Sequence, residues 1–163
     1  MFKIKLLILL LASLLLISCT NNKRDNNIRL SVSYIGGEYD GLQLYKKLRS
    51  HLNNFGILDD KSIYQIQASV SHSTNLYITN IDNTSDRERL TSNVQLKIFN
   101  TELSCFTYSF EDQLSQFYIL APGDKFVSNK SAVEEIKDDN IDYFVKKFIS
   151  SLTISDLNCD EIK

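Results

Sequence analysis

Residues 87–99 read RERLTSNVQLKIF, and in this stretch apolar and polar side chains alternate as they do in a half-buried β-strand. Leu90, Val94, Leu96 and Ile98 fall on one face, which should pack against a core. The opposite face is polar and carries Arg87, Arg89, Thr91, Asn93, Gln95 and Lys97. This strand should therefore lie inside a sheet that has one covered and one uncovered face.

A second strand follows at once, over residues 103–110. Phe106, Tyr108 and Phe110 alternate there with Cys105, Thr107 and Ser109. Residues 100–102, Asn-Thr-Glu, are a short polar connection, so the two strands should pair as an antiparallel hairpin.

Two more strands precede the hairpin. Residues 28–35 alternate with Ile28, Leu30, Val32 and Tyr34 on the inner side. Residues 62–71 alternate with Tyr64, Ile66, Ala68 and Val70 inward, and this strand can continue through residues 76–78. Residues 80–86 are rich in Asn, Asp, Ser and Thr and predict a loop.

Two helices complete the pattern. The first is expected to be capped by Asp40, to end at Gly56, and to bury the stripe Leu42, Tyr45, Leu48, Leu52 and Phe55. The second is expected to be capped by Asn129 or Ser131, and its apolar positions are Val133, Ile136, Ile141, Phe144, Val145, Phe148, Ile149 and Leu152. Residues 111–130 have no clear pattern. The order β-α-β-β-β-α predicts an α+β fold, a two-layer sandwich of a four-stranded sheet with both helices on one face.

The N-terminal segment has the features of an export signal. Lys3 and Lys5 precede twelve mostly apolar residues, 6–17, which are too few to span a bilayer. The segment ends in Leu16-Ile17-Ser18-Cys19, which resembles the bacterial lipobox and implies cleavage after Ser18 and acylation of Cys19. Thr20, where an aspartate would favour the inner membrane, favours the outer membrane.

The chain divides accordingly into a signal peptide (1–18), the lipidated cysteine with a polar tether (19–27), one domain (28–154) and a C-terminal tail (155–163). Removal of the signal leaves 145 residues, among them 16 basic and 20 acidic ones, and a net charge of −4. This acidic balance argues against nucleic-acid binding.

Two further cysteines, Cys105 and Cys159, can form a disulfide in an oxidising compartment. The alternative is a small strand residue and a free thiol in a loose tail, because spacing alone does not fix connectivity. Neither cysteine belongs to a CxxC pair or has histidines at metal-binding spacing, so we expect no metal site.

The sequence carries no recognisable catalytic motif, and we expect neither an enzyme nor a cofactor. His51 and His72 are the only histidines, and each is expected at the surface. The carboxylate pairs lie where turns and helix starts explain them: Asp59-Asp60, Glu134-Glu135 and Asp138-Asp139.

The outward face of the predicted sheet is the candidate binding surface. It holds four basic residues and no acid, which suits an anionic ligand or a polar protein wall. Its predicted members are Arg29, Ser31, Ser33, Gln65, Gln67, Ser69, Ser71, Arg87, Arg89, Thr91, Asn93, Gln95, Lys97, Thr107 and Ser109. Arg87 and Arg89 are the main candidates for anionic contacts, and Lys97 and Arg29 are weaker ones. The alternative is an ordinary solvated sheet face.

The chain resembles the LPS-assembly lipoprotein (LptE) family, in particular its alphaproteobacterial members. The resemblance rests on residues 87–98, on Phe106-Thr107-Tyr108-Ser109-Phe110 with Phe117-Tyr118, and on the helix with Phe144, Phe148 and Leu152. It implies a plug and assembly partner of the outer-membrane β-barrel LptD that binds lipopolysaccharide, with Arg87, Arg89, Lys97 and Arg29 as candidate contacts. The segment after Cys19, Thr-Asn-Asn-Lys-Arg, departs from the family pattern.

Two other functions fit the same features. One is a structural or surface lipoprotein, such as a host-facing antigen. The other is the auxiliary lipoprotein of an inner-membrane lipid transporter. The sequence specifies neither the lipid nor whether the host makes lipopolysaccharide.

Overall fold

A computed structural model describes residues 28–78, 86–119 and 126–152, together with Leu157 and Cys159. The predicted signal peptide, Cys19 and the tether lie outside these residues. The elements in chain order are β1 (Ser31–Gly36), α2 (Glu38–Asn54), β2 (Tyr64–Ile78), β3 (Asp86–Asn100), β4 (Cys105–Ile119) and α3 (Phe126–Ser151).

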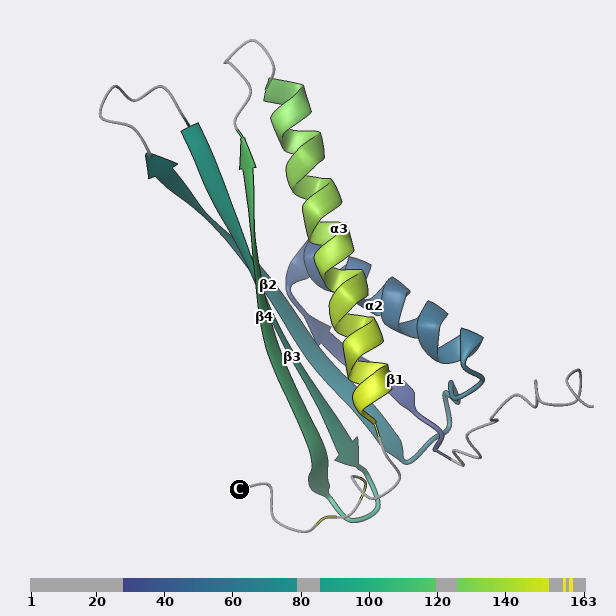
Figure 1. Cartoon of the computed structure of the whole chain (residues 1–163). Helices are drawn as coiled ribbons and strands as arrows, with labels where there is room; N and C mark the ends of the chain where they lie inside the picture. The colour runs from purple at the N-terminus through teal and green to yellow at the C-terminus, as the bar shows by residue number, and fades with distance from the viewer. Residues whose placement is uncertain (1–27, 79–85, 120–125, 153–156, 158, 160–163) are drawn as a thin grey trace, which may run out of the picture.

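The strands form one sheet in the order β1-β2-β3-β4. β1 runs parallel to β2, and the other two pairs are antiparallel. Both helices lie on the same side of this long, twisted sheet (Figure 1). The predicted α+β sandwich, with its four strands and two helices, is confirmed.

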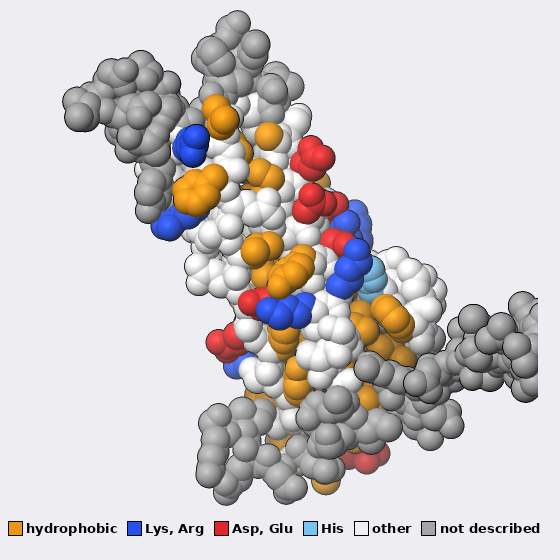
Figure 2. Space-filling model, in the orientation of Figure 1, with side chains coloured by type: hydrophobic (Ala, Val, Ile, Leu, Met, Phe, Trp, Pro, Cys, Tyr) orange, Lys and Arg blue, Asp and Glu red, His pale blue; other side chains and the backbone are white. Residues whose placement is uncertain are grey.

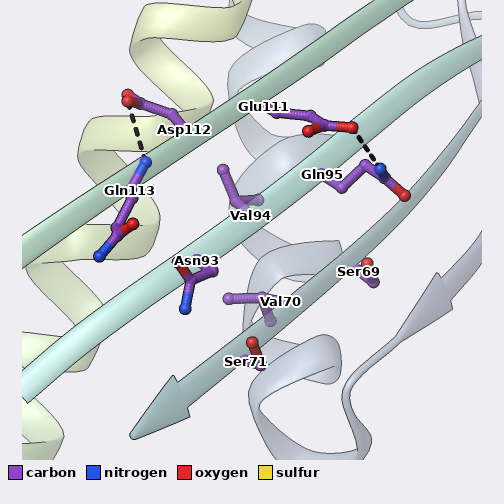
Figure 3. A pocket seen from close by; sticks show the side chains of 9 residues that line it. All are labelled: Ser69, Val70, Ser71, Asn93, Val94, Gln95, Glu111, Asp112 and Gln113. Carbon is purple, nitrogen blue, oxygen red and sulfur yellow. Dashed lines mark hydrogen bonds between the residues drawn. The ribbon is translucent and has the colours of Figure 1, made fainter.

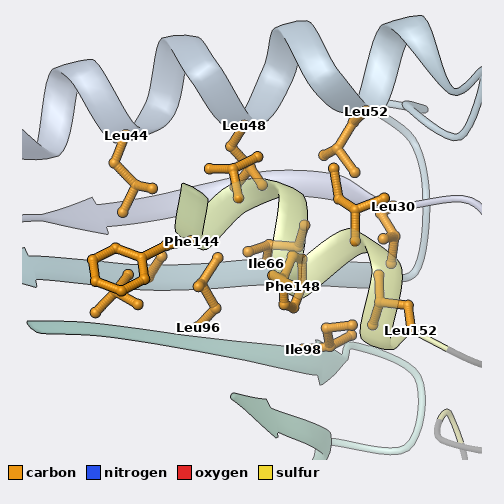
Figure 4. Close-up of a cluster of buried hydrophobic side chains, with 14 of the residues drawn as sticks. Leu30, Leu44, Leu48, Leu52, Ile66, Leu96, Ile98, Phe144, Phe148 and Leu152 are labelled. Carbon is orange, nitrogen blue, oxygen red and sulfur yellow. The ribbon is translucent and has the colours of Figure 1, made fainter. Parts of the chain in front are cut away.

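The apolar core lies between the helices and the half of the sheet that includes β1 (Figure 4). Leucines one turn apart on α2 meet aromatic and aliphatic residues of α3, and both rest on the inner positions of the sheet. The fully buried members are Leu30, Leu44, Leu48, Leu52, Ile66, Leu96, Ile98, Ile141, Phe144, Val145 and Phe148. The predicted inner faces of the second and third strands are therefore correct in this half.

Helix α2 begins three residues earlier than predicted, so Asp40 lies in its first turn and does not cap it. Gly37 precedes the helix with φ 110°, and a Cβ atom there would lie 2.4 Å from the carbonyl oxygen of Val70. Only glycine fits this approach. The predicted stripe is partly wrong, because Leu42 and Phe55 are exposed.

Helix α3 begins at Phe126, so neither Asn129 nor Ser131 caps it. Ser and Asn are weak helix formers, but tertiary packing overrides such small preferences. The predicted body of the helix is correct, since Ile141, Phe144 and Phe148 are buried.

Strand β4 continues to Ile119, nine residues beyond its predicted end. The alternation persists there, but polar residues occupy two of its inner positions. Asp112 accepts a hydrogen bond from Lys147 Nζ at 2.8 Å, and Gln116 donates to Asn140 at 2.6 Å. Both partners belong to α3, and a local sequence pattern does not show them.

Two bulges change which side chains face outward. One lies between Val32 and Tyr34 of β1 and leaves Tyr34 68% exposed, not inward as predicted. The other lies opposite Ile98 and Phe99, where Thr107 is the extra residue of β4. Phe106 therefore pairs with Phe99 and is exposed, while Thr107 is buried.

A disulfide joins Cys105, at the start of β4, to Cys159 in the C-terminal tail, with their Cα atoms 6.1 Å apart. Leu157, two residues earlier, is buried in the core. This part of the predicted tail thus packs against the domain and is not a loose end. Among the helices that the structure describes, none combines the length and hydropathy needed to cross a bilayer.

Candidate functional site

The face of the sheet opposite the helices is built from odd-numbered residues of β2, β3 and β4, which the strand register aligns in rows. Figure 3 views the middle of this face with the helices behind it. Successive rows, written from β2 to β4, are Gln67–Lys97–Ser109, Ser69–Gln95–Glu111, Ser71–Asn93–Gln113, Ser73–Thr91–Ser115 and Asn75–Arg89–Phe117. The predicted polar face therefore exists on these strands.

The second and third of these rows line an open hollow of about 570 Å³. The hollow carries hydroxyl and amide groups and one outward-facing carboxylate, Glu111, which accepts a hydrogen bond from Gln95 Nε2 at 2.5 Å. The expectation of an acid-free face is therefore wrong. The error follows from the early predicted end of the fourth strand, because Glu111 lies just beyond it.

Arg87, Arg89, Phe117 and Ile119 form what we call the distal patch, at the end of the sheet opposite the 101–104 turn. Arg87 pairs with Ile119 and Arg89 with Phe117 across the β3–β4 ladder. Phe117 is 58% exposed and Ile119 is 74% exposed. Figure 2 shows basic and hydrophobic side chains together over the upper end of the sheet. The patch thus combines two cations with two exposed apolar groups.

The inner side of the same strand end has the opposite charge. Glu88 lies between the two arginines in sequence, so it points to the other face, where the Tyr118 hydroxyl donates to its carboxylate. Burial and this hydrogen bond raise the pKa of Tyr118 to about 12. The alternation Arg-Glu-Arg thereby keeps the acid away from the distal patch.

Lys97 and Arg29 do not join the distal patch. Lys97 lies eight residues from Arg89 on the same strand, about 27 Å away. Its Nζ atom lies 5.8 Å from the centre of the Phe106 ring. Arg29 precedes β1, at the other edge of the sheet, and its guanidinium donates to the carbonyl oxygen of Gly56. Lys97 thus lies on the predicted face but far from the distal patch, and the prediction that Arg29 belongs to the same surface is wrong.

Three hydroxyl side chains of the predicted face donate hydrogen bonds to backbone carbonyls instead. Ser31 donates to the carbonyl of Tyr64 at 3.3 Å, and Ser33 donates to that of Ile66 at 3.1 Å. Thr107 donates to the carbonyl of Ile98 at 3.4 Å from its bulge. These side chains support strand pairing and are not part of the binding surface.

The two histidines both have protein partners, contrary to the prediction of surface positions. His51 Nε2 lies 2.8 Å from Asp142 Oδ1 and links α2 to α3. His72 has only 3% of its side chain exposed, and its Nδ1 lies 2.7 Å from Ser92 Oγ. The alternation of Ile66, Ala68 and Val70 places residue 72 on the inner face, so the sequence pattern itself indicates an inward His72. Within the described ranges, no group of three or more His, Cys, Asp or Glu residues is placed to hold a metal ion.

Solved structures of several bacterial proteins share this fold. Rare lipoprotein B from Shewanella oneidensis has a TM-score of 0.54 and 14% identity, over 74% of this chain and 95% of that one. Lipoprotein B from Nitrosomonas europaea has a TM-score of 0.56 and 12% identity, over 76% and 85%. A neuraminyllactose-binding hemagglutinin homolog from Helicobacter pylori has a TM-score of 0.55 and 11% identity, over 83% and 91%.

No family model and no curated protein sequence matches this chain. At these identities the likeness establishes the fold alone. The chain therefore has an α+β fold that also occurs in bacterial lipoproteins.

Proposed function

We propose that this chain is an outer-membrane lipoprotein, anchored through Cys19, that acts as plug and assembly partner of the LptD barrel and assists lipopolysaccharide delivery to the cell surface. The lipobox-like segment supports the anchor. The fold shared with lipoprotein B structures supports a lipoprotein of this type.

The uncovered sheet face suits contact with the inner wall of a water-filled barrel. Its middle rows offer hydroxyl and amide groups, which both donate and accept hydrogen bonds. A surface of this kind pairs with a polar wall directly or through bridging water.

The distal patch is the surface that we propose binds lipopolysaccharide. Arg87 and Arg89 project from one face of β3, and guanidinium groups bind phosphate oxygens through paired hydrogen bonds. Phe117 and Ile119 lie beside them and are exposed, so they can cover part of an acyl chain. A phosphorylated glycolipid has both chemical features, and a free phosphate has only one.

Replacing Arg87 and Arg89 together with Glu should weaken binding of purified lipopolysaccharide at least about tenfold, because two phosphate contacts are lost and two repulsive charges appear. Binding is measured by displacement of a fluorescent lipopolysaccharide from the purified chain. The melting temperature should stay near that of the wild type, since the patch lies outside the core.

Lys97→Glu is the matched control, because it reverses a charge on the same strand about 27 Å away. Its effect on binding should be smaller than that of the double variant. Equal binding by wild type and the double variant would remove the role assigned to the distal patch.

A surface lipoprotein is the second candidate function. The fold is shared with the Helicobacter pylori hemagglutinin homolog, and the central hollow offers hydroxyl and amide groups of the kind that bind sugars. This candidate requires no barrel partner, and that difference separates the two.

A further inference from the structure

A chain of buried polar side chains crosses the layer between α3 and the sheet, just beyond the apolar core. Gln116 Nε2 donates to Asn140 Oδ1 at 2.6 Å, and Asn140 Nδ2 donates to Ser92 Oγ at 2.8 Å. Ser92 Oγ lies 2.7 Å from His72 Nδ1. Asn140 and Ser92 are fully buried, so these bonds replace the water that the groups have lost.

These bonds fit a neutral His72 whose Nδ1 accepts from Ser92. Since Ser92 Oγ accepts from Asn140, its own hydrogen can go to His72 Nδ1. The neutral imidazole then carries its proton on Nε2, which faces Asp40 Oδ2 at 3.9 Å. A second proton, on Nδ1, would turn this acceptor into a donor, so the Ser92 hydroxyl hydrogen would lose its acceptor.

We propose that His72, Ser92 and Asn140 form an acid-sensitive latch, which holds the first half of α3 against the sheet and releases it when His72 takes up a proton. The first half of α3 means residues 126–140 here. Protonation opposes the latch in two ways: it reverses the Ser92 bond, and it places a charge in a buried site.

The charged groups around His72 do not offset this cost. Asp40 of α2 and Glu134 of α3 favour the imidazolium, whereas Lys137 of α3 opposes it. Lys137 Nζ also lies 3.5 Å from Asp40 Oδ2 and partly neutralises that carboxylate. Burial is the largest influence, and the pKa of His72 is lowered from its usual value.

The sign of the pH dependence follows from this lowered pKa. In the released state His72 meets water and titrates near its ordinary value of about 6.5. Its protonation therefore favours release as the pH falls below about 6.5, and the closed state is fully favoured above that value.

Release can be local because the apolar anchoring of α3 lies in its second half. The buried apolar residues described in this helix run from Ile141 to Ile149, and the buried Leu152 directly follows it. Among residues 129–140, whose side chains the structure describes, Asn140 alone is buried, and Ala132, Val133 and Ile136 are half-buried. Opening of this half thus releases fewer buried apolar side chains, among those described, than opening of the second half would. It also uncovers the inner face of the sheet behind the distal patch, including Leu90.

Hydrogen exchange of the full chain, measured between pH 7.5 and 5 and corrected for the intrinsic rate, tests the latch. Exchange of amides 129–140 should rise as the pH falls below about 6.5, by up to about tenfold per pH unit for one linked proton. Amides 141–151 should show no such rise. His72→Asn keeps an acceptor for Ser92 but does not titrate, so this rise should disappear. His51→Asn, which removes the other histidine, should retain it.

An equal acid-dependent rise in His72→Asn and wild type would overturn the proposal, as would no rise in the wild type. If His72→Asn does not fold, the test is the pH titration of His72 in the wild type, followed through its imidazole Cε1–H resonance. The latch requires His72 to titrate below about 6.5. Titration of His72 at or above that value would contradict it.

Discussion

Replacing Phe148 with alanine should lower the free energy of unfolding by about 3 to 5 kcal/mol. The side chain is fully buried between α3 and the sheet. Its ring centre lies 6.0 Å from that of Tyr108 and 5.8 Å from that of Phe110, both on β4. Truncation would leave a cavity between α3 and β4, and the surrounding helices and strands can close it only in part.

Urea denaturation of the two proteins measures this loss. Tyr143→Ala is the matched control, because it removes an aromatic ring from the same helix at a position that is 44% exposed. Its cost should be clearly smaller than that of Phe148→Ala. A cost below about 1 kcal/mol for Phe148→Ala would show that α3 does not pack on the sheet as described.

Removing the disulfide by the double substitution Cys105→Ser and Cys159→Ser should lower the free energy of unfolding by about 4 kcal/mol. The two cysteines are 54 residues apart, so the crosslink closes a large loop in the unfolded chain. The bond also holds the tail next to Leu157, which is buried in the core. The loss of the bond should therefore also loosen the end of the sandwich that is near the 101–104 turn.

Denaturation of the wild type with and without a reductant gives an independent measure of the same bond. The reduced wild type should approach the stability of the double variant, and the reductant should not change the double variant. If the double variant is as stable as the oxidised wild type, the disulfide has no structural role.

Much of the fold was predictable because local patterns determine it. The alternation over residues 87–99 predicts β3 correctly, and the apolar spacing on α2 predicts two of its buried leucines, Leu48 and Leu52. The failures have specific tertiary causes. The sequence predicts too early an end for β4, because Asp112 and Gln116 occupy inner positions. Their hydrogen-bond partners there, Lys147 and Asn140, belong to α3.

The candidate site was predicted only in part for the same reason. Arg87 and Arg89 were correctly placed on one outward face, since a regular strand separates them by two residues. Their apolar neighbours Phe117 and Ile119 were missed, because they lie on the unrecognised extension of β4. Arg29 was misplaced, since it precedes the edge strand β1 and its guanidinium bonds to the carbonyl oxygen of Gly56.

The most direct test of the proposed function is co-purification from bacterial outer membranes. The acylated, tagged chain is extracted in mild detergent and isolated, and the bound proteins are identified by mass spectrometry. We expect the LptD barrel in near-equal amount with the wild type. Recovery of the chain alone, or with an inner-membrane transporter in place of the barrel, would contradict the proposed function.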